Sequence, residues 1–214
     1  MTGVIRIVVV DDHQMFAESL SRLVGTEDGF EVAGVAATGA AATSLARAVR
    51  PDVALVDFRL PDASGADVAA AMLAESPGTK VLMLTGADDD SALAQAIEAG
   101  CAGFLTKDRA VEELISAIRV VASGECYMPA RLLANLLPRF RRDARPPGLE
   151  LSDRERTILS HLRDGVSSRD IAAREHLSIH TVRNHIQSVL TKLGAHSQLQ
   201  AVAIATRSHL FDDA

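Results

Sequence analysis

The sequence lacks tryptophan, has few aromatic residues and contains only two cysteines, Cys101 and Cys126. The cysteines show no CxxC spacing and have no neighbouring histidine cluster, which argues against a structural disulfide or a zinc site. We expect both to be small buried hydrophobic residues. Charges interrupt every apolar run before it is long enough to cross a bilayer. The first apolar run contains Arg6 and has no basic leader or cleavage site, so we expect a cytoplasmic protein without membrane association.

Charge is unevenly distributed along the 214 residues. The net formal charge is −6, of which residues 1–124 carry −9, residues 125–150 carry +2 and residues 151–214 carry +1. An acidic N-terminal part and a near-neutral to basic C-terminal part are typical of two domains with different partners. We therefore predict one domain over 1–124, a linker with a short helix over 125–149, and a second domain over 150–214.

The first domain alternates five times between apolar runs and helical patterns. Continuous apolar runs favour strands that are buried on both faces. We expect these strands at Ile5–Val10, Phe30–Ala36, Asp52–Asp57, Lys80–Thr85 and Gly103–Leu105. We expect helices at His13–Val24, Ala40–Val49, Gly65–Glu75, Ser91–Ala99 and Val111–Ala122. The alternation predicts an α/β domain with an open, five-stranded parallel sheet and helices on both faces.

Polar residues gather where these strands end, which is where chemistry is placed in open parallel sheets. Asp11 and Asp12 follow the first strand, Asp57 ends the third, Thr85 ends the fourth, and Lys107 follows the fifth. Three carboxylates at one edge repel each other, and Mg²⁺, which prefers carboxylate oxygens, relieves that repulsion. A carboxylate beside Mg²⁺ can attack a phosphoryl group, while the lysine and the hydroxyl neutralise its oxygens. The set predicts a magnesium-dependent site that accepts a phosphoryl group.

The motifs around these residues resemble the receiver domain of response regulators. They are Asp11-Asp12, Asp57-Phe58-Arg59-Leu60-Pro61 with Gly65 beyond, Leu84-Thr85-Gly86, and Ala99-Gly100-Cys101-Ala102-Gly103-Phe104-Leu105-Thr106-Lys107. The resemblance implies a flavodoxin-like fold with strand order 2-1-3-4-5. The sequence departs from the family pattern at Asp108, where proline is common, and at Cys101, where alanine is usual. Neither departure touches the chemistry.

The same resemblance implies a role for each matching residue. Asp57 would accept a phosphoryl group from a sensor histidine kinase. Mg²⁺ would be held by Asp11, Asp12, Asp57 and the backbone carbonyl of Arg59. Thr85 and Lys107 would contact the phosphoryl oxygens, and Phe104 would be the switch aromatic whose rotamer follows Thr85.

The C-terminal part of the chain begins with a basic linker and continues as helices. Arg139–Gly148 contains Pro146-Pro147-Gly148, which breaks helices, and a short helix beginning near Pro129 is expected before it. No strand pattern follows Leu151. Capping signals predict four helices, which make a compact all-α domain. The first helix begins with a capping box at Ser152–Glu155 and ends at Gly165, and the second spans Ser168–His176. The third begins after Ser178 and ends at Gly194, and the fourth begins with a capping box at Ser197 and Gln200.

The third of these helices has two contrasting faces. Its apolar face is formed by Val182, Ile186, Val189, Leu190 and Leu193. Its polar face carries side chains that reach DNA phosphates and base edges, namely His180, Arg183, Asn184, Gln187 and Thr191. The preceding helix joins it through a short turn, as in a helix-turn-helix. An ordinary solvated face on a small bundle would show the same spacing.

The wider pattern over residues 150–206 resembles the LuxR-type DNA-binding domain. The matching residues are Leu151–Glu155, Gly165, Ile171-Ala172, Ser178, Thr181–Ile186 and Lys192–Gly194. Together with the receiver, this resemblance points to the NarL/FixJ class of response regulators, which are phosphorylation-controlled, DNA-binding transcription regulators of two-component systems. It implies that Arg183, Asn184 and Gln187 face the groove of double-stranded DNA. Phosphate contacts would come from Lys192 and from the polar residues near the helix start, Ser178, His180 and Thr181.

Two positions in this domain and the last helix leave alternatives open. Glu175 stands where the family usually has an apolar residue, so it either loosens the packing of two helices or snorkels to solvent. His185 is expected to pack rather than to bind a ligand. The final helix carries a stripe of Leu199, Val202, Ala203 and Thr206, which either packs internally or forms a weak dimer contact. The family resemblance favours a homodimer on DNA.

The sequence disfavours two other classes of function. A phosphatase with an aspartyl nucleophile usually has a second acid two residues after it, where this chain has Arg59, so we do not expect an enzyme. A module that merely docks partners is disfavoured by the acid cluster and by the attached reader helix. The opposite charges of the two domains favour a closed arrangement in which the receiver covers the reader helix until Asp57 is phosphorylated.

Overall fold

The computed structural model describes residues 3–86, 90–128, 151–208 and 210–211. The chain divides into two compact units, Met1–Tyr127 and Met128–Ala214, and each has a hydrophobic core of its own. The helix expected near Pro129 and the linker at Arg139–Gly148 lie outside the described residues. Within the described ranges, no helix is both long and apolar enough to cross a membrane.

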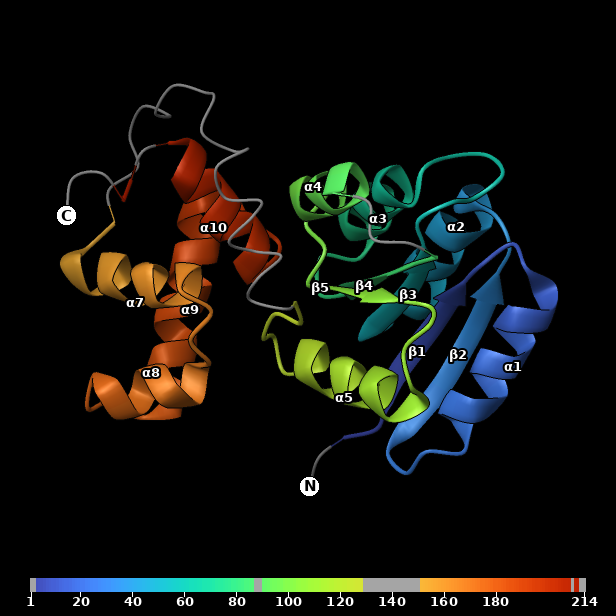
Figure 1. The fold of residues 1–214 in the computed structure, drawn as a ribbon, viewed down its shortest axis with the longest axis horizontal. Helices are drawn as coiled ribbons and strands as arrows, with labels where there is room; N and C mark the ends of the chain where they lie inside the picture. Colours follow the sequence, from blue (N-terminus) through green and yellow to red (C-terminus); the bar gives the residue numbers. More distant parts are fainter. Residues whose placement is uncertain (1–2, 87–89, 129–150, 209, 212–214) are drawn as a thin grey trace. The chain divides into compact units, whose positions relative to one another are not determined.

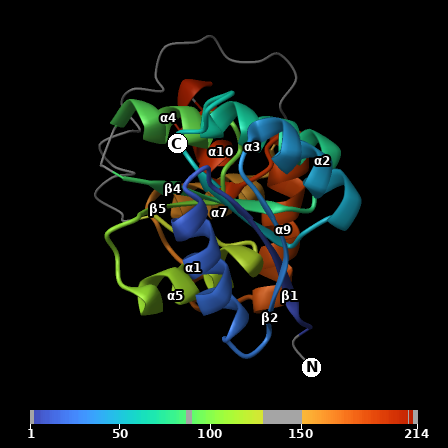
Figure 2. The same ribbon diagram turned by 90° about the vertical axis from the view of Figure 1, so that its right-hand side faces the viewer.

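The first unit is a five-stranded parallel sheet in the order β2-β1-β3-β4-β5. Its strands are β1 (Ile5–Val10), β2 (Phe30–Ala36), β3 (Val53–Asp57), β4 (Lys80–Thr85) and β5 (Gly103–Thr106). Its helices are α1 (Gln14–Gly25), α2 (Gly39–Val49), α3 (Gly65–Glu75), α4 (Asp90–Glu98) and α5 (Val111–Ala122). In Figures 1 and 2, α1 and α5 cover one face of the sheet, and α2, α3 and α4 cover the other. The predicted fold is confirmed.

The apolar runs of the central strands follow from this layering. All five residues of β3 are buried, as are the last four of β1, because helices cover both faces of the sheet. On one face, Leu20 of α1 and Ile118 of α5 pack with Leu55 of β3 in a single cluster. Each fully buried side chain of this size stabilises the fold by about 1.5–3 kcal/mol. The same packing brings the carboxyl ends of β1, β3, β4 and β5 to one edge.

After α5 the chain returns to the edge strand. Tyr127 forms a parallel bridge with Gly103. The backbone N–H of Phe104 donates to the carbonyl of Tyr127 at 3.0 Å, and the N–H of Tyr127 donates to the carbonyl of Ala102 at 3.1 Å. The Tyr127 hydroxyl donates to Glu113 Oε1 at 3.1 Å. Glycine suits position 103, because a Cβ there would lie 3.1 Å from the Tyr127 carbonyl oxygen.

The second unit contains α7 (Asp153–Arg163), α8 (Ser168–Arg174), α9 (Ile179–Leu193) and α10 (Gln198–Arg207). The other three helices all pack against α9. The expected capping box of Ser152 and Glu155 is present, and Ser178 caps α9 by accepting from the backbone N–H of Thr181. Gly194, in the left-handed region at φ 63°, ends α9 as predicted.

Two expected helix ends differ in detail. At α10, Ser197 accepts from the backbone N–H of Gln200, but the Gln200 side chain accepts from the N–H of His196, one residue before the cap. Helix α8 ends at Arg174, two residues earlier than expected, because His176 adopts a left-handed φ of 53° that a helix does not continue through. The predicted stripe of α10 is buried, and Val202 of that stripe belongs to the core of the helical unit.

Candidate functional site

Three of the predicted site residues meet at the carboxyl edge of the sheet. Asp11 follows β1, Asp57 ends β3 and Lys107 follows β5. The Lys107 Nζ lies 2.6 Å from Asp11 Oδ2 and 3.0 Å from Asp57 Oδ2. Asp11 and Asp57 are buried. One ammonium group thus bridges two carboxylates that are 46 positions apart in the sequence, and this is the arrangement that the strand-end pattern predicts.

The charges in this cluster are not in balance. Burial raises the pKa of the Asp57 carboxyl, and the charge of Asp11 raises it further, although Lys107 acts in the opposite direction. Burial acts to lower the pKa of Lys107, but its bonds to Asp11 and Asp57 outweigh that effect and raise it. Asp57 therefore carries a charge that its surroundings stabilise poorly. Such a group gains from a cation or from covalent modification.

Asp12 and His13 complete an oxygen-rich cluster around Asp11. The His13 Nδ1 lies 3.3 Å from Asp11 Oδ1 and 3.0 Å from Asp12 Oδ1. Ligand atoms of Asp11, Asp12, His13 and Asp57 all lie within 4.8 Å of one another. Three carboxylates are a donor set that suits a hard divalent cation such as Mg²⁺. Sequence reasoning missed His13, although its place directly after the two acids was a usable signal.

Asp57 opens into a cavity of about 470 Å³. The cavity is lined by His13, Phe16, Asp57, Phe58, Arg59, Thr85, Gly86 and Lys107. Thr85 is buried at the end of β4, and its carbonyl accepts from the backbone N–H of Lys107 at 2.7 Å. Phe104 is buried on β5, and Phe16 lies 4.6 Å from the Lys107 ammonium, measured to the ring centroid. Phe16 and Phe58 were missed because apolar residues here look like core residues in the sequence.

A tight loop holds Arg59 beside Asp57. Arg59 forms an antiparallel bridge with Ser64, and the backbone N–H of Gly65 donates to the carbonyl of Phe58 at 2.7 Å. A Cβ at position 65 would lie 2.3 Å from the Asp57 carbonyl oxygen, so the loop requires glycine there. The loop thereby fixes the backbone beside the phosphoacceptor candidate.

The polar face of α9 is presented as predicted. Arg183, Asn184 and Gln187 are exposed, while Val182 and Ile186 are buried on the opposite face. A shallow hollow of about 460 Å³ lies on this face, lined by Asn184, Gln187, Ser188, Thr191 and Lys192. At the helix start, the hydroxyls of Ser178 and Thr181 are 2.8 Å apart, so both residues take part in the cap. His185 is partly buried, which agrees with a packing role.

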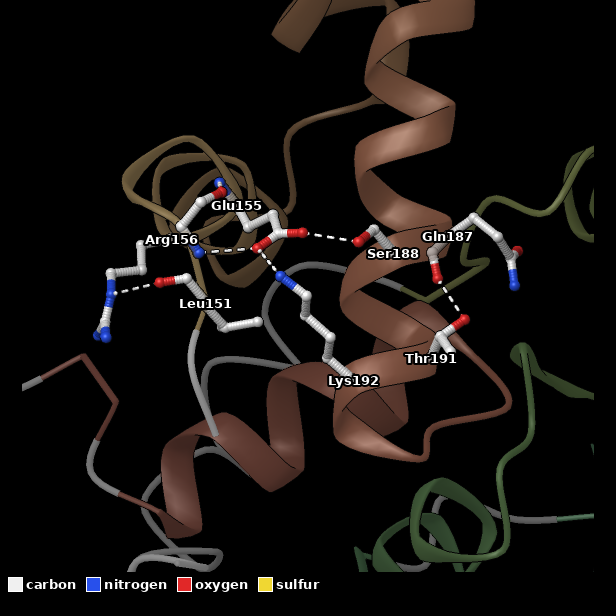
Figure 3. A network of polar contacts seen from close by, with 8 residues as sticks. Leu151, Glu155, Arg156, Gln187, Ser188, Thr191 and Lys192 are labelled. Carbon is white, nitrogen blue, oxygen red and sulfur yellow. Dashed lines mark hydrogen bonds and ion pairs between the residues drawn. The ribbon is translucent and has the colours of Figure 1, made fainter. Parts of the chain in front are cut away.

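Lys192 lies in a polar network that sequence reasoning did not foresee. Figure 3 shows its Nζ donating to Glu155 Oε2 at 2.7 Å, while the Ser188 hydroxyl donates to Glu155 Oε1 at 2.7 Å. The backbone N–H of Ser152 also donates to Glu155 Oε2, at 2.7 Å. Burial acts to raise the pKa of Glu155, but these bonds outweigh it and lower the pKa to about 2. The network joins the start of α7 to the second half of α9.

Glu175 forms contacts that neither of its expected roles includes. Its carboxylate accepts from Arg154 Nη1 at 2.6 Å and lies 2.8 Å from His161 Nε2. These partners lower the pKa of Glu175, His161 most strongly. The acid at this position therefore joins the end of α8 to α7, a contact that the sequence did not predict.

Comparison with known proteins supports the same assignment for both units. Residues 7–119 match the response regulator receiver domain, and residues 149–205 match the bacterial regulatory proteins of the luxR family. Over 208 residues the chain is 38% identical to the probable transcriptional regulatory protein NarL of Mycobacterium tuberculosis, covering 97% of this chain and 96% of that protein. The chain belongs to the NarL/FixJ class of response regulators.

Two further proteins resemble this response regulator along nearly its whole length. It is 35% identical over 204 residues to the DNA-binding transcriptional activator DevR/DosR of Mycobacterium tuberculosis, covering 94% of each. The crystal structure of the response regulator ChrA, from a heme-sensing two-component system, matches with a TM-score of 0.52 and 28% identity over 98% of this chain and 100% of that one. This response regulator is a transcriptional regulator of a two-component system, with a receiver and a LuxR-type DNA-binding domain, as the sequence predicts.

Proposed function

We propose that Asp57 accepts a phosphoryl group from a phosphohistidine of a sensor histidine kinase, and that this controls binding to double-stranded DNA. The observation that carries the proposal is the Lys107 bridge between Asp11 and Asp57 at the wall of the 470 Å³ cavity. In this proposal the receiver spans 1–124, the linker 125–149 and the DNA-binding domain 150–214, and the first residues of the linker include Tyr127, which pairs with the receiver's edge strand. The protein acts in the cytoplasm.

The transfer uses groups that already face the cavity. A carboxylate oxygen of Asp57 forms a bond to phosphorus as the P–N bond of phosphohistidine breaks, and the released imidazole takes a proton from water. The raised pKa of Asp57 makes its carboxylate a better nucleophile once it is charged. Lys107 and the Thr85 hydroxyl then pair with phosphoryl oxygens. Phe104, which is buried on β5, acts as the switch residue that follows Thr85.

The acid cluster fits a Mg²⁺ ion held by Asp11, Asp12, Asp57 and the Arg59 carbonyl. The fit rests on three carboxylates whose ligand atoms lie within 4.8 Å of one another. When bound, the ion supplies positive charge that neutralises the phosphoryl oxygens. Arg59 stands two residues after Asp57, where an aspartyl phosphatase usually has an acid. We therefore propose that the protein is phosphorylated at Asp57 as a regulator and is not an enzyme that turns over substrate.

We propose that α9 enters the major groove as the recognition helix. Arg183, Asn184 and Gln187 would face base edges, and Ser178, His180, Thr181 and Lys192 would face phosphates. The base contacts are supported by the exposure of Arg183, Asn184 and Gln187 on one side of α9. The role of α9 as a recognition helix is supported by the similarity to an activator described as DNA-binding. A homodimer on two half-sites would double these contacts, which matters for a helical region with a net charge of only +1 over residues 151–214.

The test is phosphorylation followed by DNA binding. With Mg²⁺ and a small acyl phosphate as donor, the full-length protein should gain one phosphate by intact mass and should then bind a DNA selected from a random duplex library more tightly. Asp57→Asn should gain none. The matched control is Asp67→Asn, which removes an exposed acid of α3 and should be labelled normally. Labelling of Asp57→Asn to the wild-type level would exclude Asp57 as the acceptor.

A further inference from the structure

Two exposed residues on α9 form a defined pair one helical turn apart. The Nδ2 of Asn184 lies 3.2 Å from the Nδ1 of His180. Side chains at i and i+4 are neighbours on a helix surface, so the pair forms without distortion. The Ser178 hydroxyl accepts from the backbone N–H of Thr181 at 3.0 Å, which fixes the turn that carries His180. Val182 and Ile186 are buried against the unit's core, so the position of Asn184 is fixed as well.

The contact restrains the side chain of Asn184. With the ring proton on Nε2, the amide nitrogen donates to the His180 Nδ1; with the proton on Nδ1, the amide turned by 180° accepts through Oδ1 instead. In both tautomers the contact uses one end of the amide. One donor and one acceptor of the Asn184 amide stay available to the groove.

This donor and acceptor match one base. In the major groove adenine presents an acceptor at N7 beside a donor at N6, and an asparagine amide pairs with both. Guanine presents two acceptors and would engage the amide hydrogens alone. Neither thymine nor cytosine presents an acceptor beside a donor, so the amide pairs bidentately with adenine only.

We propose that His180 is a positioning residue that orients Asn184 for bidentate recognition of adenine, an inference that rests on the proposed binding of DNA by α9. For His180 alone, this role replaces the phosphate contact proposed above. A phosphate contact adds affinity for every sequence alike, whereas a positioning residue changes discrimination at one base pair and acts through Asn184.

The experiment uses the full-length phosphorylated protein and a random double-stranded DNA library. The selected sequence is then remade with all four base pairs at each position, and affinities are measured for each variant. Asn184→Ala should reduce the preference for adenine at one position by about 5-fold to 100-fold. His180→Ala should reduce the preference at that same position by about 2-fold to 5-fold. His180→Gln, whose side-chain carbonyl accepts from the same amide, should restore it.

A double-mutant cycle separates positioning from direct contact. In the Asn184→Ala background, His180→Ala should leave the preference at that position unchanged. The inference is overturned if His180→Ala weakens all sequences alike and lowers the dependence of affinity on salt, or if His180→Gln fails to restore the preference. If the wild-type protein selects no sequence from the library, the proposed DNA binding fails first, and this outcome is distinct from either of those.

Discussion

Each unit of the molecule holds a lysine against a buried carboxylate, yet the two acids have opposite properties. Lys107 lies 3.0 Å from Asp57 in the receiver, and Lys192 lies 2.7 Å from Glu155 in the helical unit. The pKa of Asp57 is raised by burial and by Asp11, while the pKa of Glu155 is lowered to about 2. Similar ion pairs therefore do not imply similar roles.

The difference lies in the other neighbours of each acid. Glu155 accepts from a backbone N–H and a serine hydroxyl as well as from Lys192, so its charge is well stabilised and supports the fold. Asp57 shares its lysine with a second carboxylate and faces a cavity. A buried acid that is short of donors is destabilising until a ligand arrives, which is how functional sites often cost stability.

The strongest test of this contrast is Glu155→Ala. Removing one partner of a buried pair leaves Lys192, Ser188 and the Ser152 N–H without their acceptor, so the helical unit should lose about 3 kcal/mol of unfolding free energy. Hydrogen exchange of α7 and α9 under increasing urea measures this locally. Asp153→Ala, which removes an exposed acid from the same helical turn, should cost about 0.5 kcal/mol. Equal losses in the two variants would show that Glu155 is an ordinary capping residue.

Acid should affect the two units in opposite ways. Glu155 stabilises the folded state while the pH stays above its ordinary value of 4.5, and this contribution is lost as the pH falls toward about 2. Asp57 has a raised pKa, so its cost is complete above that pKa, shrinks as the pH falls from there toward the ordinary value of 3.8, and is absent below 3.8. Without Mg²⁺, lowering the pH from 7 to about 4 should therefore slow hydrogen exchange of β3 relative to α9 after correction for intrinsic rates. Acceleration in both units together would contradict the assignment.

Asp57→Asn should stabilise the receiver. Asparagine removes a poorly solvated charge and its repulsion with Asp11, so we expect a gain of about 1 kcal/mol in metal-free buffer. Thermal unfolding, monitored by the hydrogen exchange of β3 and β4, measures this gain. The comparison is Asp67→Asn, which should lose stability rather than gain it, because Asp67 is a first-turn acid of α3 and accepts from the Ser64 hydroxyl. If Asp57→Asn destabilises the receiver by as much as Glu155→Ala destabilises the helical unit, the two acids are alike and the contrast fails.

The smallest effect concerns Glu175. Its bonds to Arg154 and His161 join α7 to α8 near the surface, where ion pairs contribute little to stability. Glu175→Ala should therefore lower the stability of the helical unit far less than Glu155→Ala does, and added salt should shrink the difference because it screens partly exposed charges. A loss that salt leaves unchanged would show that Glu175 acts through packing instead.

Local sequence patterns predicted the meeting of three receiver residues because each of them ends or directly follows a strand. Strand ends of a parallel sheet share one edge, so Asp11, Asp57 and Lys107 were expected to meet. The Glu155 network escaped prediction because its sequence signal, a capping box, accounts for one bond of that carboxylate. Its bond to Lys192, 37 residues later, depends on how α7 packs against α9. The partners of Glu175 were not predicted for the same reason, since they lie on another helix.

The bridge between Tyr127 and Gly103 has a consequence for how the receiver should be cut from the chain. As the last strand of its sheet, β5 has backbone groups that face outward, and unpaired groups of this kind invite strand pairing between molecules. Tyr127 engages the N–H of Phe104 and the carbonyl of Ala102. A fragment that stops at residue 124 would uncover both groups and become prone to self-association. A receiver fragment that extends through Met128 would keep its edge protected.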